Sequence, residues 1–122
     1  MAITGLRVFS VPVSDQDRSL RFYRDVLGAK LVSDVVISPT MRWIELAFGD
    51  SFTHLSLVTW FDSYVAGTLT GAVLETADLE GDLSRLDENK VGHSGIETAP
   101  WGRYATFQDP DGNGWILQVS NS

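Results

Sequence analysis

The residues best suited to chemistry lie in a hairpin-like segment in the first half of the chain. Glu45 and His54 stand on either side of a turn-forming Gly-Asp pair, in two runs that alternate apolar and polar side chains. A turn centred on that pair places Glu45 opposite His54 and Trp43 opposite Ser56. A carboxylate beside an imidazole raises the basicity of the ring and can fix its tautomer. The pair is therefore a candidate acid–base couple or a ligand-gripping pair; the alternative is a polar cross-strand pair with no role in turnover.

The same alternation divides the hairpin into two faces. One face is apolar and suits a covering helix; it carries Ile44, Leu46, Phe48, Leu55, Leu57 and Phe61. The other mixes aromatic and polar groups; it carries Met41, Trp43, Glu45, His54, Ser56 and Trp60. Trp43 and Trp60 could stack on a flat ligand, and Trp101 in the second half is a third candidate. The alternative for each tryptophan is packing in a core or at an interface.

Two similar series of elements must position these residues. The first is predicted as a strand over residues 3–13, a helix from Asp15 to the cap glycine Gly28, a strand over 31–37 and two strands within 41–60. The second repeats the order: a strand over 71–76, a helix from Asp78 ended by Gly92, and three short strands around 96, over 103–107 and over 115–119. We expect a single domain, residues 1–122, built from a module at 1–63 and another at 70–122. One-sided helices among antiparallel strands predict an α+β protein.

Two motifs at the ends of this plan resemble a known family. Asp15, Ser19, Phe22-Tyr23 and Leu27-Gly28 are similar to the first helix of the vicinal oxygen chelate superfamily, which holds glyoxalase I, the bleomycin-resistance proteins and ring-cleaving dioxygenases. The segment at 109–113, Asp-Pro-Asp-Gly-Asn, followed by Trp115, Leu117 and Gln118, resembles the family's last hairpin. The resemblance spans residues 6–119. It implies two tandem βαβββ units that form a curved mixed sheet with a concave groove.

The resemblance also implies where a metal would be bound. Metal-dependent relatives hold one divalent ion on the concave face, and the four ligand positions fall on Val8, near Ser56, near Ala72 and near Ile116. Valine and isoleucine cannot donate an electron pair, and a divalent ion needs several N or O ligands. We therefore expect no metal at the family's usual site and no other cofactor. A two-ligand site built from Glu45 and His54 is a weaker alternative.

The composition of the chain limits the classes of molecule that it could bind. The chain has 122 residues, no cysteine and a net charge of −7, with only nine lysines and arginines, which argues against nucleic acid as a partner. No signal peptide or membrane-spanning run is visible, so we expect a cytoplasmic protein without a membrane partner. The acidic charge would suit a cationic ligand or simply maintain solubility.

Two functions follow from these expectations. The first is a metal-free, antibiotic-like small-molecule binding protein of the bleomycin-resistance kind, working as a homodimer. Its groove would be lined by Val8, Ser10, Trp43, Glu45, His54, Ser56, Trp60 and Trp101. The second is an enzyme (a lyase, isomerase or ring-cleaving dioxygenase) that uses a rearranged metal site or acid–base chemistry through His54 and Glu45. The identity of the ligand is not encoded in any motif of the sequence.

Overall fold

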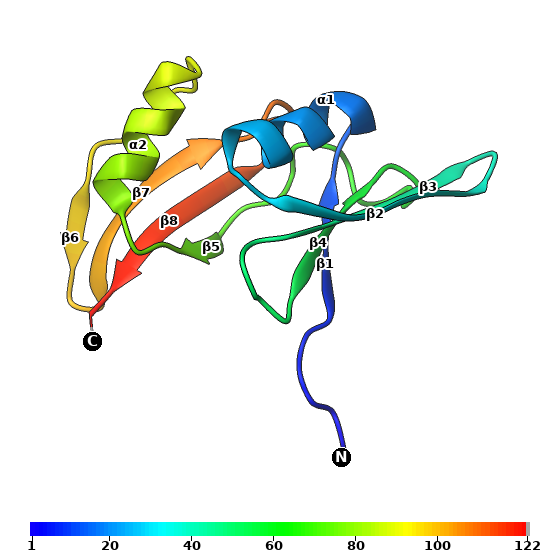
Figure 1. Cartoon of the computed structure of the whole chain (residues 1–122), viewed down its shortest axis with the longest axis horizontal. Coiled ribbons are helices and arrows are strands. Elements are labelled where there is room, and N and C mark those ends of the chain that lie inside the picture. Colours follow the sequence, from blue (N-terminus) through cyan, green and yellow to red (C-terminus); the bar gives the residue numbers. More distant parts are fainter. Residues whose placement is uncertain (122) are drawn as a thin grey trace. The chain divides into compact units, whose positions relative to one another are not determined.

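The structure, a computed structural model, describes residues 1–121 and confirms the predicted α+β fold. The chain separates into two compact units, Met1–Ala66 and Gly67–Ser122. Each unit contains a strand, a helix and three further strands, in that order (Figure 1). Among the described residues, no helix is both long and apolar enough to cross a membrane.

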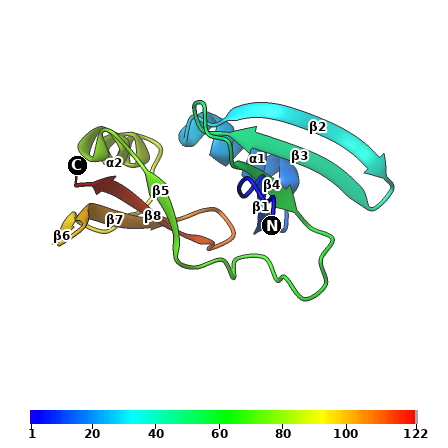
Figure 2. The same ribbon diagram turned by 90° about the horizontal axis from the view of Figure 1, so that it is seen from below.

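The first unit is a four-stranded mixed sheet with the strand order β1-β4-β3-β2. Its first strand is parallel to β4, and the other neighbours are antiparallel. The strands β2 and β3 form a long hairpin that extends past the helix (Figure 2). The elements of this unit are β1 (Val8–Pro12), α1 (Gln16–Arg21), a π-helical continuation η1 (Phe22–Val26), β2 (Lys30–Ser38), β3 (Met41–Ala47) and β4 (His54–Val58).

The sequence signals for the first helix are confirmed at both of its ends. The carboxylate of Asp15 accepts a hydrogen bond from the backbone N–H of Arg18 at 3.1 Å, as an N-cap does. Gly28 has a φ of +78°, the left-handed conformation that a glycine adopts at little cost after a helix. The predicted start of the first strand is wrong, because β1 begins only at Val8 and the preceding residues are exposed.

The helix side of the first sheet forms the core of this unit. Ile44, Leu46 and Leu57 are fully buried there, and Leu55 is 7% exposed. From the helix, Leu20, Phe22 and Tyr23 are also buried. One member of the predicted apolar face does not belong to it: Phe61 lies beyond the end of β4 and is 51% exposed.

The second unit repeats the topology with the strand order β5-β8-β7-β6. Its helix begins after the N-cap Asp78, whose carboxylate accepts from the N–H of Gly81 at 3.0 Å. Leu79, Leu83 and Leu86 form its buried stripe. The elements are β5 (Ala72–Glu75), α2 (Leu79–Glu88), β6 (Glu97–Ala99), β7 (Gly102–Gln108) and β8 (Gly114–Ser120).

The end of α2 differs from the prediction. The helix stops at Glu88, and Lys90, rather than Gly92, takes the left-handed conformation with a φ of 59°. The N–H of Val91 then bonds to the carbonyl of Leu86 at 2.8 Å, which closes the helix end. Gly92 marks the region correctly but not the residue.

Candidate functional site

The β3–β4 hairpin confirms the predicted faces, except for Phe61, and corrects the predicted register. Glu45 lies opposite Ser56, and Leu46 lies opposite Leu55, so the placements of Glu45 opposite His54 and of Trp43 opposite Ser56 are wrong. The connection is centred one residue later than assumed, between Asp50 and Ser51. A one-residue shift of the centre moves each partner by two positions, and two positions along a strand return a side chain to the same face.

Glu45 and His54 are in contact despite the change of register. Oε2 of Glu45 lies 2.5 Å from Nδ1 of His54, and Oε1 of Glu45 accepts from Nε1 of Trp43 at 3.1 Å. The side chains of Glu45 and His54 are 14% and 15% exposed. The hydrogen bond from His54 lowers the pKa of the Glu45 carboxyl, against the effect of burial, and the bond from Trp43 lowers this pKa further. The arrangement keeps an ionised carboxylate beside the ring.

An aromatic group borders this polar pair. The ring centroids of Trp43 and Trp60 are 6.1 Å apart with an interplanar angle of 36°, and those of Trp60 and Phe61 are 6.0 Å apart. Both tryptophans are partly exposed. The sequence predicted the two tryptophans as a pair and did not include Phe61 beside them.

The floor of the same face is built by β1 and β4. Val8 lies beside His54, and Ser10 lies beside Ser56. The hydroxyl of Ser56 is buried and has no hydrogen-bond partner among the described residues. Tyr64 donates from its hydroxyl to the carbonyl of Ser10 at 2.8 Å, which anchors the segment after β4 against β1.

The side chain of Gln16, which the sequence did not single out, links the strands β3 and β4. Regular pairing between β3 and β4 covers only the positions around Glu45 and Leu46. Beyond it, the side-chain amide of Gln16 donates to the carbonyls of Arg42 and Leu57, at 2.7 and 2.9 Å. One side chain from α1 therefore bridges the strands where their own ladder ends. No motif in the sequence distinguishes this glutamine from an ordinary first-turn residue.

The donors on these faces do not fit the divalent ion of the metal-dependent relatives. In the first unit Val8 pairs with His54, and in the second Ala72 pairs with Trp115 and Val73 with Ile116. Residues 1–121 contain no group of three or more His, Cys, Asp or Glu side chains placed to hold a metal ion. Aliphatic side chains cannot replace such ligands.

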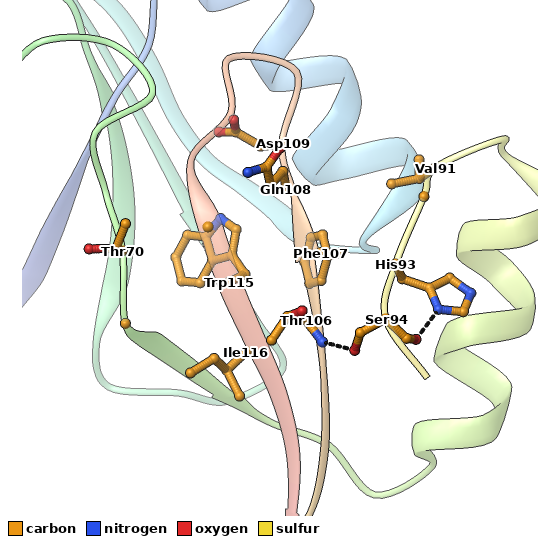
Figure 3. Close-up of a pocket in the computed structure, with 13 residues that line it drawn as sticks. Thr70, Val91, His93, Ser94, Thr106, Phe107, Gln108, Asp109, Trp115 and Ile116 are labelled. Carbon is orange, nitrogen blue, oxygen red and sulfur yellow. Dashed lines mark hydrogen bonds between the residues drawn. The ribbon is translucent and has the colours of Figure 1, made fainter. Parts of the chain in front are cut away.

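The second unit has an open groove of about 690 Å³ that sequence reasoning did not predict. In Figure 3, Phe107 and Trp115 lie on neighbouring strands of its wall, and the ring of His93 turns toward α2. The groove is lined by Thr70, Gly71, Val91, Gly92, His93, Ser94, Thr106, Phe107, Gln108, Asp109, Gly114, Trp115 and Ile116. Of the positions selected from the sequence as ligand-binding or metal-ligating, only Ile116 lines it.

The histidine in this groove is held by its own unit. Nδ1 of His93 lies 2.6 Å from the carbonyl oxygen of Ser94, and Nε2 lies 2.8 Å from a carboxylate oxygen of Asp87. The bond to the carbonyl raises the pKa of His93, burial opposes this, and the bond to Asp87 raises the pKa further. Both ring nitrogens are engaged, so this histidine ties Asp87 of α2 to the loop segment that follows the helix.

Trp101, the remaining predicted ligand residue, belongs to the second unit. It follows β6 and is 59% exposed, with its carbonyl accepting from the N–H of Asn121 at 2.9 Å. Its side chain thus lies at the surface of that unit. Its part in binding stays a prediction.

The fold and the sequence together define the class of the protein. The sequence profile of the Glyoxalase/Bleomycin resistance protein/Dioxygenase superfamily matches residues 5–117, and the chain belongs to this superfamily. The resemblance stated from the helix and hairpin motifs is thereby confirmed.

Particular relatives are similar over nearly the whole chain. TnmS3, an antibiotic binding protein from Streptomyces sp. CB03234, is 40% identical to this chain in sequence, and the match covers 99% of both chains. Its crystal structure superposes on this structure with a TM-score of 0.94. A superfamily member from Sphaerobacter thermophilus is 30% identical, covers 98% of this chain and 100% of its own, and has a TM-score of 0.90. These two structures share the fold of this chain at substantial sequence identity.

One relative carries an enzymatic name. The putative ring-cleaving dioxygenase MhqA of Bacillus subtilis is 29% identical over 128 residues, which cover 96% of this chain but only 40% of MhqA. The chain therefore corresponds to less than half of that protein.

Proposed function

We propose that this protein binds a small organic molecule of the antibiotic type on the mixed face of its first unit, and holds it without a metal ion and without turnover. The observation that carries the proposal is the aromatic pair Trp43 and Trp60, 6.1 Å apart, beside the polar pair Glu45 and His54 on one partly exposed face. Ligand sites typically combine aromatic walls with a few placed polar groups in this way.

The comparisons support a binding role. TnmS3, 40% identical over 99% of both chains, is described as an antibiotic binding protein. The absence of a fitting ligand set for a divalent ion supports binding over metal-dependent chemistry, because the Lewis acid that polarises vicinal oxygens would have no donors here. Residues 1–121 contain no such donor set.

An acid–base enzyme is the second candidate, and the Glu45–His54 contact favours it. A histidine beside an ionised carboxylate is a competent general base if a substrate proton lies within reach. The two candidates differ in the fate of the ligand, which a binder returns unchanged and an enzyme converts.

Titration tests the proposal. Tryptophan fluorescence would be followed while antibiotics with planar rings are added, both cationic ones (bleomycin, doxorubicin) and an uncharged one (chloramphenicol). Each would be recovered afterwards for mass analysis. We expect one of them to bind in stoichiometric amounts and to be recovered intact. Trp43→Ala should weaken binding by about tenfold, since stacking and burial of one large aromatic contribute on the order of 1 kcal/mol or more.

The matched control is Ile96→Ala, in the second unit. Ile96 is an apolar residue whose side chain is 38% exposed. This variant should bind like the original protein. Conversion of the ligand to a product that disappears in His54→Ala would instead establish the acid–base enzyme. Binding that Trp43→Ala leaves unchanged would exclude the proposed face.

We also propose that two copies associate. β2 exposes four aliphatic side chains by 47–73%, namely Val32, Val35, Val36 and Ile37, and such a strand is a poor surface to leave in water. Sedimentation velocity on the purified protein would test this, and a monomer at micromolar concentration would contradict it.

A further inference from the structure

The carboxylate of Glu45 already interacts with other groups of the protein. One carboxylate oxygen contacts His54 at 2.5 Å and the other accepts from Trp43 at 3.1 Å. Arg7, which precedes β1, also lies close enough to act on Glu45 electrostatically. A cationic ligand would have to share the carboxylate with these groups, which already offset its negative charge. The first unit thus does not present a free negative charge at this place.

The contact with Glu45 fixes what His54 offers. An ionised carboxylate only accepts hydrogen bonds, so the contact selects the tautomer of His54 in which Nδ1 carries the proton and Nε2 is an acceptor. Among residues 1–121, Nε2 of His54 has no hydrogen-bond partner. The chain therefore offers an acceptor nitrogen, held in orientation by the carboxylate on its far side.

A second unsatisfied group lies on the same face. The hydroxyl of Ser56 is fully buried and unpartnered, directly beside Glu45 in β3 and Ser10 in β1. A buried hydroxyl without a partner costs about 1–3 kcal/mol. The face that carries His54 thus contains a second polar group that has no partner within the described residues.

From the acceptor nitrogen of His54 and the neighbouring pair of tryptophans we infer the chemical class of the ligand: a neutral planar ring system that carries an uncharged hydrogen-bond donor, a hydroxyl or an N–H, at its edge. The donor is received by Nε2 of His54, while the rings of Trp43 and Trp60 contact the flat part. The inference rests on the proposed binding function and makes it specific. His54 is then the residue that determines specificity, through an acceptor that the sequence alone leaves undefined.

Three probes of equal ring size test this inference. They are 2-naphthol, which has a donor; 2-methoxynaphthalene, in which the donor is replaced by a methyl ether; and 2-naphthylmethylammonium, which is a cation. Affinities at pH 7 would be measured by calorimetry on the full chain. We expect 2-naphthol to bind about tenfold more tightly than the ether and more tightly than the cation, as one made or lost hydrogen bond implies.

The variant His54→Phe keeps a ring of similar size and removes the acceptor, so it should bind 2-naphthol and the ether equally. The matched control His93→Gln alters the other histidine, whose ring nitrogens are both engaged within the second unit, and should keep the preference. Where His54→Phe does not fold, ¹⁵N spectra of the unaltered protein replace it. Addition of 2-naphthol should then shift the Nε2 resonance of His54.

The outcomes separate the inference from the proposed function. Equal binding of 2-naphthol and its ether, still weakened by Trp43→Ala, would overturn the inference and leave the binding function intact. Tighter binding of the cation would overturn it in favour of a cationic ligand. Binding of none of the three probes would also overturn it, and the antibiotic titration would then decide the proposed function separately.

Discussion

Ser56 and Glu45 are two polar residues with unusual hydrogen bonding for the interior of a sheet. Both lie side by side on the mixed face of the first unit. One is a hydroxyl with no partner, and the other is a carboxylate whose two oxygens are both engaged. Each gives a prediction about stability that does not depend on knowing the ligand.

Replacing Ser56 by alanine should stabilise the protein. The substitution removes a buried group that has lost its water and gained no partner, so we expect the free energy of unfolding to rise by about 1 kcal/mol. Urea unfolding at pH 7 measures this. The control is Ser19→Ala, at an equally buried serine of α1 that does have interaction partners, and it should not stabilise. A loss of stability in Ser56→Ala would show that its hydroxyl is satisfied.

Glu45 should make stability depend on acid pH. Because its pKa is lower in the folded than in the unfolded protein, its contribution is present above the ordinary value of 4.5 and is lost as the pH falls through the lower folded value. Glu45→Gln removes this dependence, so the variant should lose less free energy of unfolding than the original protein between pH 7 and about pH 3. Glu97→Gln, at an exposed glutamate of β6, is the control. Equal losses in all three proteins would contradict the prediction.

At the scale of elements, the two helices begin in the same way and end differently. Asp15 and Asp78 both cap a first turn, whereas Gly28 ends the first helix and Lys90 stands in the left-handed position after the second. A lysine in that conformation is strained by its Cβ atom.

The strain at Lys90 can be removed. Lys90→Gly should raise the free energy of unfolding by about 0.5–1 kcal/mol, because glycine adopts this backbone conformation without the steric cost. Thermal unfolding measures it. Gly92→Ala is the matched control: a Cβ there meets open space and the backbone is not left-handed, so a change within about 0.5 kcal/mol is expected. Destabilisation by Lys90→Gly would indicate that the lysine side chain contributes more than its backbone costs.

At the scale of the whole molecule, the two halves share one topology but carry different side chains on it. The first carries the polar and aromatic face, and the second carries a groove with a clamped histidine. A repeated topology accordingly does not imply a repeated site, since function depends on the side chains placed on the fold.

Added divalent metal ions should not change the stability of the protein. A tightly bound ion at 100 times its Kd would add about 2.7 kcal/mol to the free energy of unfolding. We expect no increase with Ni²⁺, Zn²⁺, Mn²⁺ or Fe²⁺, and no decrease with EDTA, because the described residues hold no cluster of three suitable ligands. Differential scanning calorimetry measures this. Stoichiometric binding abolished by His54→Ala would instead make a metal-dependent enzyme the leading candidate.

The sequence by itself determined the order of elements, the helix caps at Asp15 and Asp78, and the faces of the β3–β4 hairpin. These features depend on local signals, since side chains alternate every two residues along a strand and cap residues act within one turn. It also brought Glu45 and His54 to one face, and the two side chains are in contact.

Only the tertiary structure decided the details on which binding depends. The observed pairing of β3 with β4 differs from the predicted pairing by two residues, because the length of a turn depends on how its strands pack. A shift of two residues leaves each side chain on its predicted face. The bridge from Gln16, the unpartnered hydroxyl of Ser56 and the left-handed Lys90 all arise from contacts or backbone angles that no local pattern encodes. Residue type and period determine which side chains share a face, whereas hydrogen-bond partners across that face depend on distances that only the packed chain defines.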